Sequence, residues 1–317
     1  MKRLATILVA SGATVAIAAS VGAQTTRFTS GVDVVRVDTL VINGGRLVRG
    51  LKAADFEVRD AGVLQEITDV AYESLPLNVI LALDLSGSVA GQPLMQLKDG
   101  LLALIGALGT SDRAALVSFS YRLTLHSGLT GDRERLRAVV AGLVSGGSTA
   151  AIDATFAGLA LREADPGRTL LLLFSDGIDT ASWLSAKEVI DAARASDVVI
   201  YPVTVRRARY SAHTIMPGGM RGGDDGRKML EAFAEETGGR VFYADSERTL
   251  QKTLGEVLDE FKQRYVLSYT PRNVGPGGWH TLEVKVRGNR GQVKARRGYA
   301  ADGRSVSPAA TPVKEHP

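Results

Sequence analysis

The stretch Asn78-Val79-Ile80-Leu81-Ala82-Leu83-Asp84-Leu85-Ser86-Gly87-Ser88 decides the fold of this chain. Residues 79–83 are apolar, and a short unbroken apolar run is typical of a strand buried on both faces of a parallel sheet. The run ends in Asp84-x-Ser86-x-Ser88, which predicts three oxygen-bearing side chains on a tight turn. Open α/β sheets place their ligands at the carboxyl ends of such strands. One carboxylate and two hydroxyls suit a hard cation such as Mg²⁺, which takes oxygen ligands and keeps positions open.

Length and composition limit the number of domains and the kinds of functional site that the chain can have. The chain has 317 residues, enough for two modest domains, and its 45% hydrophobic and 23% charged content is that of an ordinary globular protein. It has no cysteine, which excludes disulfides, thiolate metal sites, cysteine nucleophiles and a lipidated N-terminal cysteine. Removal of Lys2 and Arg3 would leave 36 basic residues against 34 acidic ones. So small an excess of basic residues, spread along the chain, is not the clustered basic surface typical of nucleic-acid-binding proteins, despite a pI of 9.3.

Residues 1–23 are expected to be a cleaved export signal. Met1-Lys2-Arg3 is basic, residues 4–19 are apolar, and Val21-Gly22-Ala23 offers a small-residue cleavage site before Gln24. A membrane anchor is the alternative, but no basic stop-transfer flank follows, and no other segment is long and apolar enough to span a bilayer. We therefore expect an exported protein, periplasmic or extracellular, with no membrane span after cleavage.

Residues 76–264 alternate predicted strands and helices. Leucines recur at helical spacing from Leu94 to Leu104, and Leu170 to Phe174 is a second fully apolar run. The predicted strands are 79–83, 114–119, 170–174, 198–205 and 240–243, with 121–125 returning beside its neighbour, and the predicted helices are 92–108, 132–143, 150–163, 185–195, 227–237 and 249–264. Such alternation indicates crossover units, so the fold class is α/β, with a doubly wound, mostly parallel sheet flanked by helices.

The segments on either side of this unit have β patterns. In residues 24–75, Val35, Val37, Thr39 and Val41 alternate with Arg36, Asp38 and Leu40, which predicts a half-buried strand. Asn43-Gly44-Gly45 signals a turn, and 56–59 and 64–72 are further predicted strands. In residues 265–300 the predicted strands are 265–270, 279–286 and 292–297. About 45 residues are marginal for a separate core, so we expect both segments to pair in one β module. The polar tail 301–317 is expected to be disordered.

A long insertion, Arg206 to Gly226, follows the predicted strand 198–205. It is rich in glycine and holds four arginines, with Asp224 and Asp225 near its end. An insertion at the carboxyl end of a strand lies on the ligand face of such a sheet. A mobile, solvated loop is an equally good interpretation.

Two further oxygen clusters complete a candidate site. Gly146-Gly147-Ser148-Thr149 precedes a predicted helix, and Ser175-Asp176-Gly177 follows the second buried strand. With these motifs the chain resembles the von Willebrand factor type A domain family over roughly residues 76–264. The resemblance implies a sheet wrapped by helices with one antiparallel edge strand. It also implies a metal-ion-dependent adhesion site for Mg²⁺, or for Mn²⁺ or Ca²⁺, made of Asp84, Ser86, Ser88, Thr149 and Asp176. The hydroxyls would bind the ion directly, and the aspartates partly through water.

The flanks extend the likeness. Val48-Arg49-Gly50-Leu51, Asp55-Phe56-Glu57-Val58, Trp279-His280 and Arg297-Gly298-Tyr299 are similar to segments of bacterial exported von Willebrand A-related proteins. This likeness implies an architecture and no substrate.

Each candidate residue also has a simpler interpretation. The two aspartates could cap helices, the two serines could form turns, and Thr149 could be an N-cap. Asp153 could support the site from behind or be a solvated helix residue, and Asp179 is expected to be a loop charge.

The expected function is metal-dependent protein binding or adhesion. Neutral hydroxyls leave much of the ion's charge uncompensated, so an open coordination position favours an Asp or Glu carboxylate of a protein partner. A periplasmic scaffold is the alternative, and a metal-dependent hydrolase is a weaker one. Phosphate-transferring hydrolases of the haloacid dehalogenase type need a second aspartate where this chain has Ser86. The four histidines are scattered, and G-x-S-x-G, H-E-x-x-H, a Walker loop and a dinucleotide fingerprint are all absent, so we expect no enzyme and no catalytic residues.

Overall fold

The computed structural model describes residues 34–73, 75–165, 167–205, 224–275 and 277–301. The predicted signal at 1–23, nearly all of the predicted tail at 301–317 and most of the insertion at 206–226 lie outside the described residues. Within the described residues, no helix has both the length and the apolar character needed to cross a bilayer.

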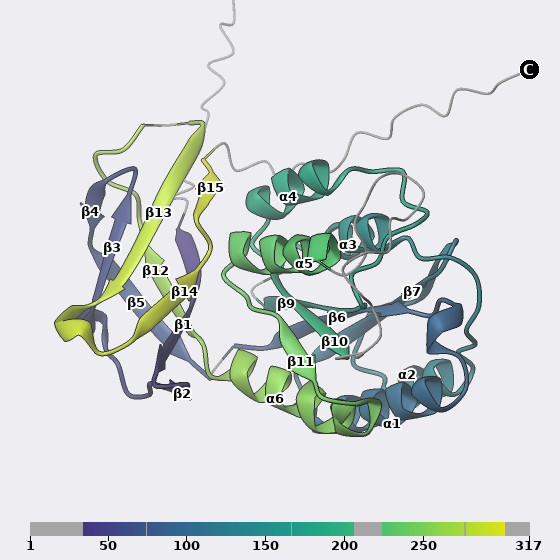
Figure 1. Ribbon diagram of the computed structural model, residues 1–317. Coiled ribbons are helices and arrows are strands. Elements are labelled where there is room, and N and C mark those ends of the chain that lie inside the picture. Colours follow the sequence, from purple (N-terminus) through teal and green to yellow (C-terminus); the bar gives the residue numbers. More distant parts are fainter. Residues whose placement is uncertain (1–33, 74, 166, 206–223, 276, 302–317) are drawn as a thin grey trace, which may run out of the picture. The chain divides into compact units, whose positions relative to one another are not determined.

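A six-stranded sheet forms the centre of an α/β domain, in the order β11-β10-β9-β6-β7-β8 (Figure 1). Its strands are β6 (Leu77–Asp84), β7 (Arg113–Phe119), β8 (Leu123–Thr130), β9 (Arg168–Phe174), β10 (Val199–Val205) and β11 (Phe242–Ala244). All neighbours pair in parallel except β7 and β8, so the sheet has the one antiparallel edge strand that was expected. Every residue of β6 and β9 is buried, as their unbroken apolar runs predict.

Helices cover both faces of this sheet. The helices are α1 (Gln92–Ala107), α2 (Arg133–Ala141), α3 (Ala151–Ala160), α4 (Ala186–Ala195), α5 (Asp224–Glu236) and α6 (Leu250–Lys262). Apolar side chains of α1, α2 and α6 share one core with Leu81 and Leu83, whereas α3, α4 and α5 pack with Ile80 and Ala82 on the other face. Neighbouring residues of β6 therefore serve two separate cores, and each fully buried leucine contributes roughly 2 kcal/mol.

The predicted helix at 227–237 differs at its start. Helix α5 begins at Asp224, so the acidic pair at the end of the predicted insertion belongs to the first helical turn. An acidic residue such as Asp225 is favourable in a first helical turn because the N-terminal end of a helix carries a partial positive charge. Short 3-10 helices lie at η1 (Ala53–Asp55), η2 (Gly87–Val89), η3 (Glu247–Thr249) and η4 (Arg287–Asn289).

The two flanking segments form a pair of sheets packed on each other. One sheet has the order β14-β1-β12-β5, with β2 beside β1, and the other has the order β15-β13-β3-β4 (Figure 1). The strands are β1 (Val35–Asn43), β2 (Arg46–Leu47), β3 (Phe56–Asp60), β4 (Val63–Gln65), β5 (Ile67–Tyr72), β12 (Tyr265–Tyr269), β13 (Trp279–Val286), β14 (Gln292–Ala295) and β15 (Gly298–Ala300). Each sheet mixes strands from before and after the α/β domain, and their inner faces share one apolar core.

Three features of this β module differ from the expectation. The single strand predicted at 64–72 is two strands, β4 and β5, which belong to different sheets because the chain changes sheet at Glu66. Leu40, predicted to be on the polar face of β1, is fully buried. Strand β15 was not expected, since its three residues carry no alternating pattern.

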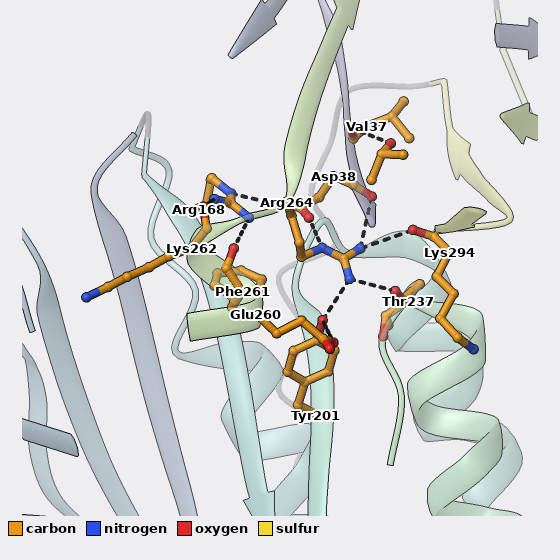
Figure 2. A network of polar contacts seen from close by, with 12 residues as sticks. Val37, Asp38, Arg168, Tyr201, Thr237, Glu260, Phe261, Lys262, Arg264 and Lys294 are labelled. Carbon is orange, nitrogen blue, oxygen red and sulfur yellow. Dashed lines mark hydrogen bonds and ion pairs between the residues drawn. The ribbon is translucent and has the colours of Figure 1, made fainter. Parts of the chain in front are cut away.

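A buried polar network joins β1 to the α/β domain (Figure 2). Arg264, directly before β12, is fully buried and forms an ion pair with Asp38 of β1, while its Nη1 donates to the Tyr201 hydroxyl and the Gly238 carbonyl at 2.9 Å each. The Nε of Arg168 donates to the other carboxylate oxygen of Asp38 at 2.8 Å. Burial alone would raise the pKa of Asp38, but the two guanidinium groups outweigh it and hold that pKa below its ordinary value.

Candidate metal site

Neighbouring parallel strands bring the two candidate aspartates to one sheet edge. Strands β6 and β9 pair in parallel with Leu83 opposite Phe174. Asp84 is the last residue of β6 and is 2% exposed, whereas Asp176 lies two residues beyond β9 and is half-buried. A small pocket at this edge is lined by Asp84, Ser88, Val89, Phe174, Ser175, Asp176 and Val205.

The turn after β6 holds the two candidate serines together. The backbone N–H of Ser86 donates to Oδ1 of Asp84 at 2.9 Å, which closes the turn over the carboxylate. The hydroxyls of Ser86 and Ser88 lie 3.1 Å apart. Ser86 is buried and Ser88 is exposed, so the oxygen cluster runs from the end of the buried strand to the surface.

The loop that carries Thr149 is fastened to this turn through its backbone. Gly146 N–H donates to the Leu85 carbonyl at 2.7 Å, and Gly87 N–H donates to the Gly147 carbonyl at 3.0 Å. Gly147 has φ of +91°, and a Cβ added there would lie 2.4 Å from a ring carbon of Tyr121. Both observations require glycine at this position, because other residues strain at such φ values and would collide with the ring.

A second loop, which follows β9, holds Thr149 from the other side. The Thr149 N–H donates to Oγ1 of Thr180 at 3.1 Å, and the Thr149 carbonyl accepts from the N–H of Thr180 at 2.9 Å. The N-cap of α3 is Ala150, so the N-cap interpretation of Thr149 is wrong. Among the described contacts, Thr149 is tied to the cluster through its loop, and none links its side chain to Asp84 directly.

Asp153 and Asp179 have structural roles that the sequence did not specify. Both oxygens of Asp153 accept backbone N–H groups, from Trp183 and Leu184, at 2.9 Å each. Oδ2 of Asp179 accepts from the N–H of Ile152 in the first turn of α3 at 3.0 Å. Asp153 is therefore not a solvated helix residue, and Asp179 is more than a loop charge. Together they clamp the loop after β9 onto α3.

Ser175 is a neighbour of the site that sequence reasoning did not single out. It is 2% exposed, its hydroxyl lies 3.5 Å from Oδ2 of Asp84, and it accepts the N–H of Gly177 at 3.1 Å. The only signal for it is its position, directly after the buried strand and before Asp176.

The charge distribution in this pocket suits a cation. Burial, with a smaller contribution from the charge of Asp176, raises the pKa of Asp84 to about 6. No lysine or arginine in the described part of the chain forms an ion pair with Asp84. A buried carboxylate in this situation is stabilised by a bound positive charge. The oxygen donors present, two carboxylates and neighbouring hydroxyls, are those that hard divalent ions prefer, so the residues fit such an ion.

The described residues include no cluster of three or more His, Cys, Asp or Glu side chains that could hold a metal. This agrees with the composition of the candidate set, which has two carboxylates and three hydroxyls. Asp84, Ser86 and Ser88 are linked by hydrogen bonds, Asp176 shares a pocket with Asp84 and Ser88, and Thr149 is connected to them through its loop.

Comparison with known proteins places the chain in a family. The family model for the von Willebrand factor type A domain matches residues 78–256. Inter-alpha-trypsin inhibitor heavy chain H4 of Sus scrofa is 25% identical over 241 residues, which cover 70% of this chain and 24% of the relative. An uncharacterized Synechocystis protein, sll0103, is 35% identical over 89 residues, 28% of this chain and 21% of the relative. The chain thus spans about a quarter of the length of these curated relatives.

Two solved structures share the fold at low identity. A von Willebrand factor type A protein from Catenulispora acidiphila has a TM-score of 0.50 at 15% identity, over 78% of this chain and 72% of the other. Proximal thread matrix protein 1 from the mussel byssus, with a zinc-occupied MIDAS motif, has a TM-score of 0.50 at 17% identity, over 65% and 50% of the two chains. Identities this low bear on the fold alone.

Proposed function

Because the chain belongs to the von Willebrand factor type A domain family, we propose that it is a metal-dependent protein-binding module. In this proposal a divalent ion at the end of β6 captures an acidic group of a partner protein. The observation that carries the proposal is the buried Asp84 beside Asp176, in a pocket that also exposes the hydroxyl-bearing Ser88. Domains of this family are commonly metal-dependent interaction modules.

The ion is proposed to be Mg²⁺, with Mn²⁺ or Ca²⁺ as substitutes. Ser86, Ser88 and Thr149 would hold it directly, and Asp84 and Asp176 would hold it directly or through water. When bound, the ion supplies a positive centre with an open position for an anionic oxygen. Uncharged hydroxyls donate electron density without cancelling this charge, so the chemistry of the donor set supports an Asp or Glu carboxylate as the partner group.

The donor set supports binding and not hydrolysis. Ser86 stands where a phosphate-transferring hydrolase needs its second aspartate. Ser118 and His126 lie within hydrogen-bond distance, at 2.8 Å, but no described carboxylate bonds to this histidine and neither residue lines the pocket. We also propose that the protein is exported and acts outside the cytoplasm. The basic and apolar residues 1–19 support this proposal.

A periplasmic scaffold remains the second candidate function. The supporting observation is the β module, which is built from both flanks and joined to the α/β domain through Asp38 and two arginines. In a scaffold the ion would serve only to stabilise the loops, and partner binding would survive a chelator.

Calorimetric titration with Mg²⁺ and Mn²⁺ tests the proposal. Wild type is expected to bind, Asp84→Ala is expected to lose binding while remaining folded, and Asp99→Ala, an exposed carboxylate on α1, is the matched control. Unchanged metal affinity in Asp84→Ala would contradict the assignment of the site.

A further inference from the structure

Three exposed apolar side chains lie on loops that form or adjoin the candidate metal site. Tyr121, Val144 and Trp183, which we call the apolar rim, are 65%, 78% and 95% exposed. Trp183 and Val144 are the two most exposed large hydrophobic residues in the described part of the chain. Single exposed apolar residues are ordinary, but large aromatic side chains gathered beside a binding site are typical of protein interfaces.

All three residues come from loops at the sheet edge that carries Asp84. Tyr121 follows the end of β7, Val144 lies in the loop between α2 and α3, and Trp183 lies in the loop after β9. The Tyr121 ring lies against Gly147, whose carbonyl accepts the N–H between the two candidate serines. The ring is therefore one backbone contact away from the turn that would hold the ion.

Trp183 is presented on a fastened loop. Its backbone N–H donates to the Asp153 carboxylate at 2.9 Å, and the backbone N–H of Thr180, three residues earlier, donates to the carbonyl of Thr149. A partner that binds this side chain would therefore lose less of its binding free energy to ordering the loop. The fold gains little from an indole that is 95% exposed, so its position is better explained by an external contact.

A positively charged side chain lies beside the apolar rim. The guanidinium carbon of Arg122, which is exposed, lies 5.7 Å from the centre of the Tyr121 ring. An acidic segment is favoured by this charge as well as by the ion, while the apolar side chains disfavour a partner that is charged throughout.

From this arrangement we infer that the partner is a protein segment in which one Asp or Glu is flanked by apolar or aromatic residues. The carboxylate meets the ion, and the flanking side chains contact the apolar rim. This inference rests on the proposed function and adds the residues that would determine specificity.

A peptide selection on the full chain tests the inference. Displayed random segments with a fixed central aspartate, and a parallel set with asparagine there, are selected in Mg²⁺ and eluted with EDTA. We expect EDTA-eluted segments from the aspartate set only, enriched in apolar and aromatic residues beside the aspartate. Synthetic peptides from that set are expected to bind Trp183→Ser at least about tenfold more weakly, as truncation of a buried interface tryptophan typically produces. Trp279→Ser, a change in the β module, is the control and is expected to bind as wild type does.

The outcomes separate the inference from the proposed function. Aspartate-dependent, EDTA-eluted peptides without apolar flanks, or with equal affinity for Trp183→Ser, would overturn the role of the rim and leave carboxylate capture standing. Absence of EDTA-eluted peptides from the aspartate set, in a protein that binds Mg²⁺ by calorimetry, would overturn both. Trp183→Ser must retain the wild-type Mg²⁺ affinity, because a loss there would show that the residue supports the site and does not contact the partner.

Discussion

Replacing Asp84 with asparagine is expected to stabilise the metal-free protein even as it removes metal binding. The carboxylate is 2% exposed, and burial together with the nearby Asp176 raises its pKa to about 6 from an ordinary value of 3.8. Each pKa unit corresponds to about 1.4 kcal/mol, so the charged form lowers the free energy of unfolding by roughly 3 kcal/mol. Asparagine avoids that cost. Its Oδ1 can still accept the Ser86 N–H, and its Nδ2 can donate to the Ser175 hydroxyl.

The difference in stability between Asp84→Asn and wild type should change with pH in one direction. A carboxyl group whose pKa is raised by folding is neutral in both states at low pH, so it costs nothing below about pH 4. The cost grows as the pH rises from the unfolded pKa of 3.8 to the folded pKa of about 6, and it is complete above the folded value. The stability advantage of Asp84→Asn over wild type should therefore be small at pH 4 and largest at neutral and alkaline pH.

Urea unfolding in EDTA at several pH values measures this difference, with Asp99→Asn as the control. Added Mg²⁺ should then stabilise wild type and Asp99→Asn, by about 2.7 kcal/mol at a hundred times the dissociation constant, and should not stabilise Asp84→Asn. The reasoning is refuted if Asp84→Asn is less stable than wild type in EDTA at pH 8. It is also refuted if the difference between them does not change with pH.

Three further substitutions test the contacts around the candidate metal site and the buried polar network that joins β1 to the α/β domain. Asp38→Ala leaves two buried arginines without their carboxylate and should lower the free energy of unfolding, measured by urea denaturation at pH 7, by about 3–5 kcal/mol. Folding lowers the pKa of Asp38, so the stabilising contribution of its carboxylate is present above the unfolded pKa and should be lost as the pH falls through the folded pKa. Gly147→Ala, at φ of +91° and against an aromatic ring, should strain the site loop by about 1–3 kcal/mol and weaken Mg²⁺ binding by calorimetry, whereas Gly106→Ala, with open space around it, should not. Asp153→Ala removes the acceptor of two loop amides and should cost about 1–3 kcal/mol, with faster hydrogen exchange at the Trp183 and Leu184 amides than in wild type.

Local sequence patterns predicted the α/β domain well because its central strands β6, β9 and β10 are fully buried. The apolar runs before Asp84 and Asp176 identify two parallel neighbours, and their shared edge then brings the carboxylates together. The β module was harder to predict. Strands of its two segments pair across about 190 residues or more, and the break at Glu66 depends on which sheet each half joins. No local signal shows that Arg264 would be fully buried, since its partner Asp38 lies so far away in the chain.

Hydrogen bonds between protein groups hold the loops of the candidate site against one another. Backbone bonds fasten the Gly147 loop to the serine turn, while Asp153 and Asp179 clamp the loop after β9 onto α3. Asp153 and Asp179 thus hold the loops beside the site, while Asp84 and Asp176 are the carboxylates that line the pocket. A site whose loops are fastened in this way loses less conformational freedom when a ligand binds. Metal affinity and fold stability should therefore be separable in this protein. Asp84→Asn tests that separation directly, because it is expected to raise the stability of the fold and to abolish metal binding.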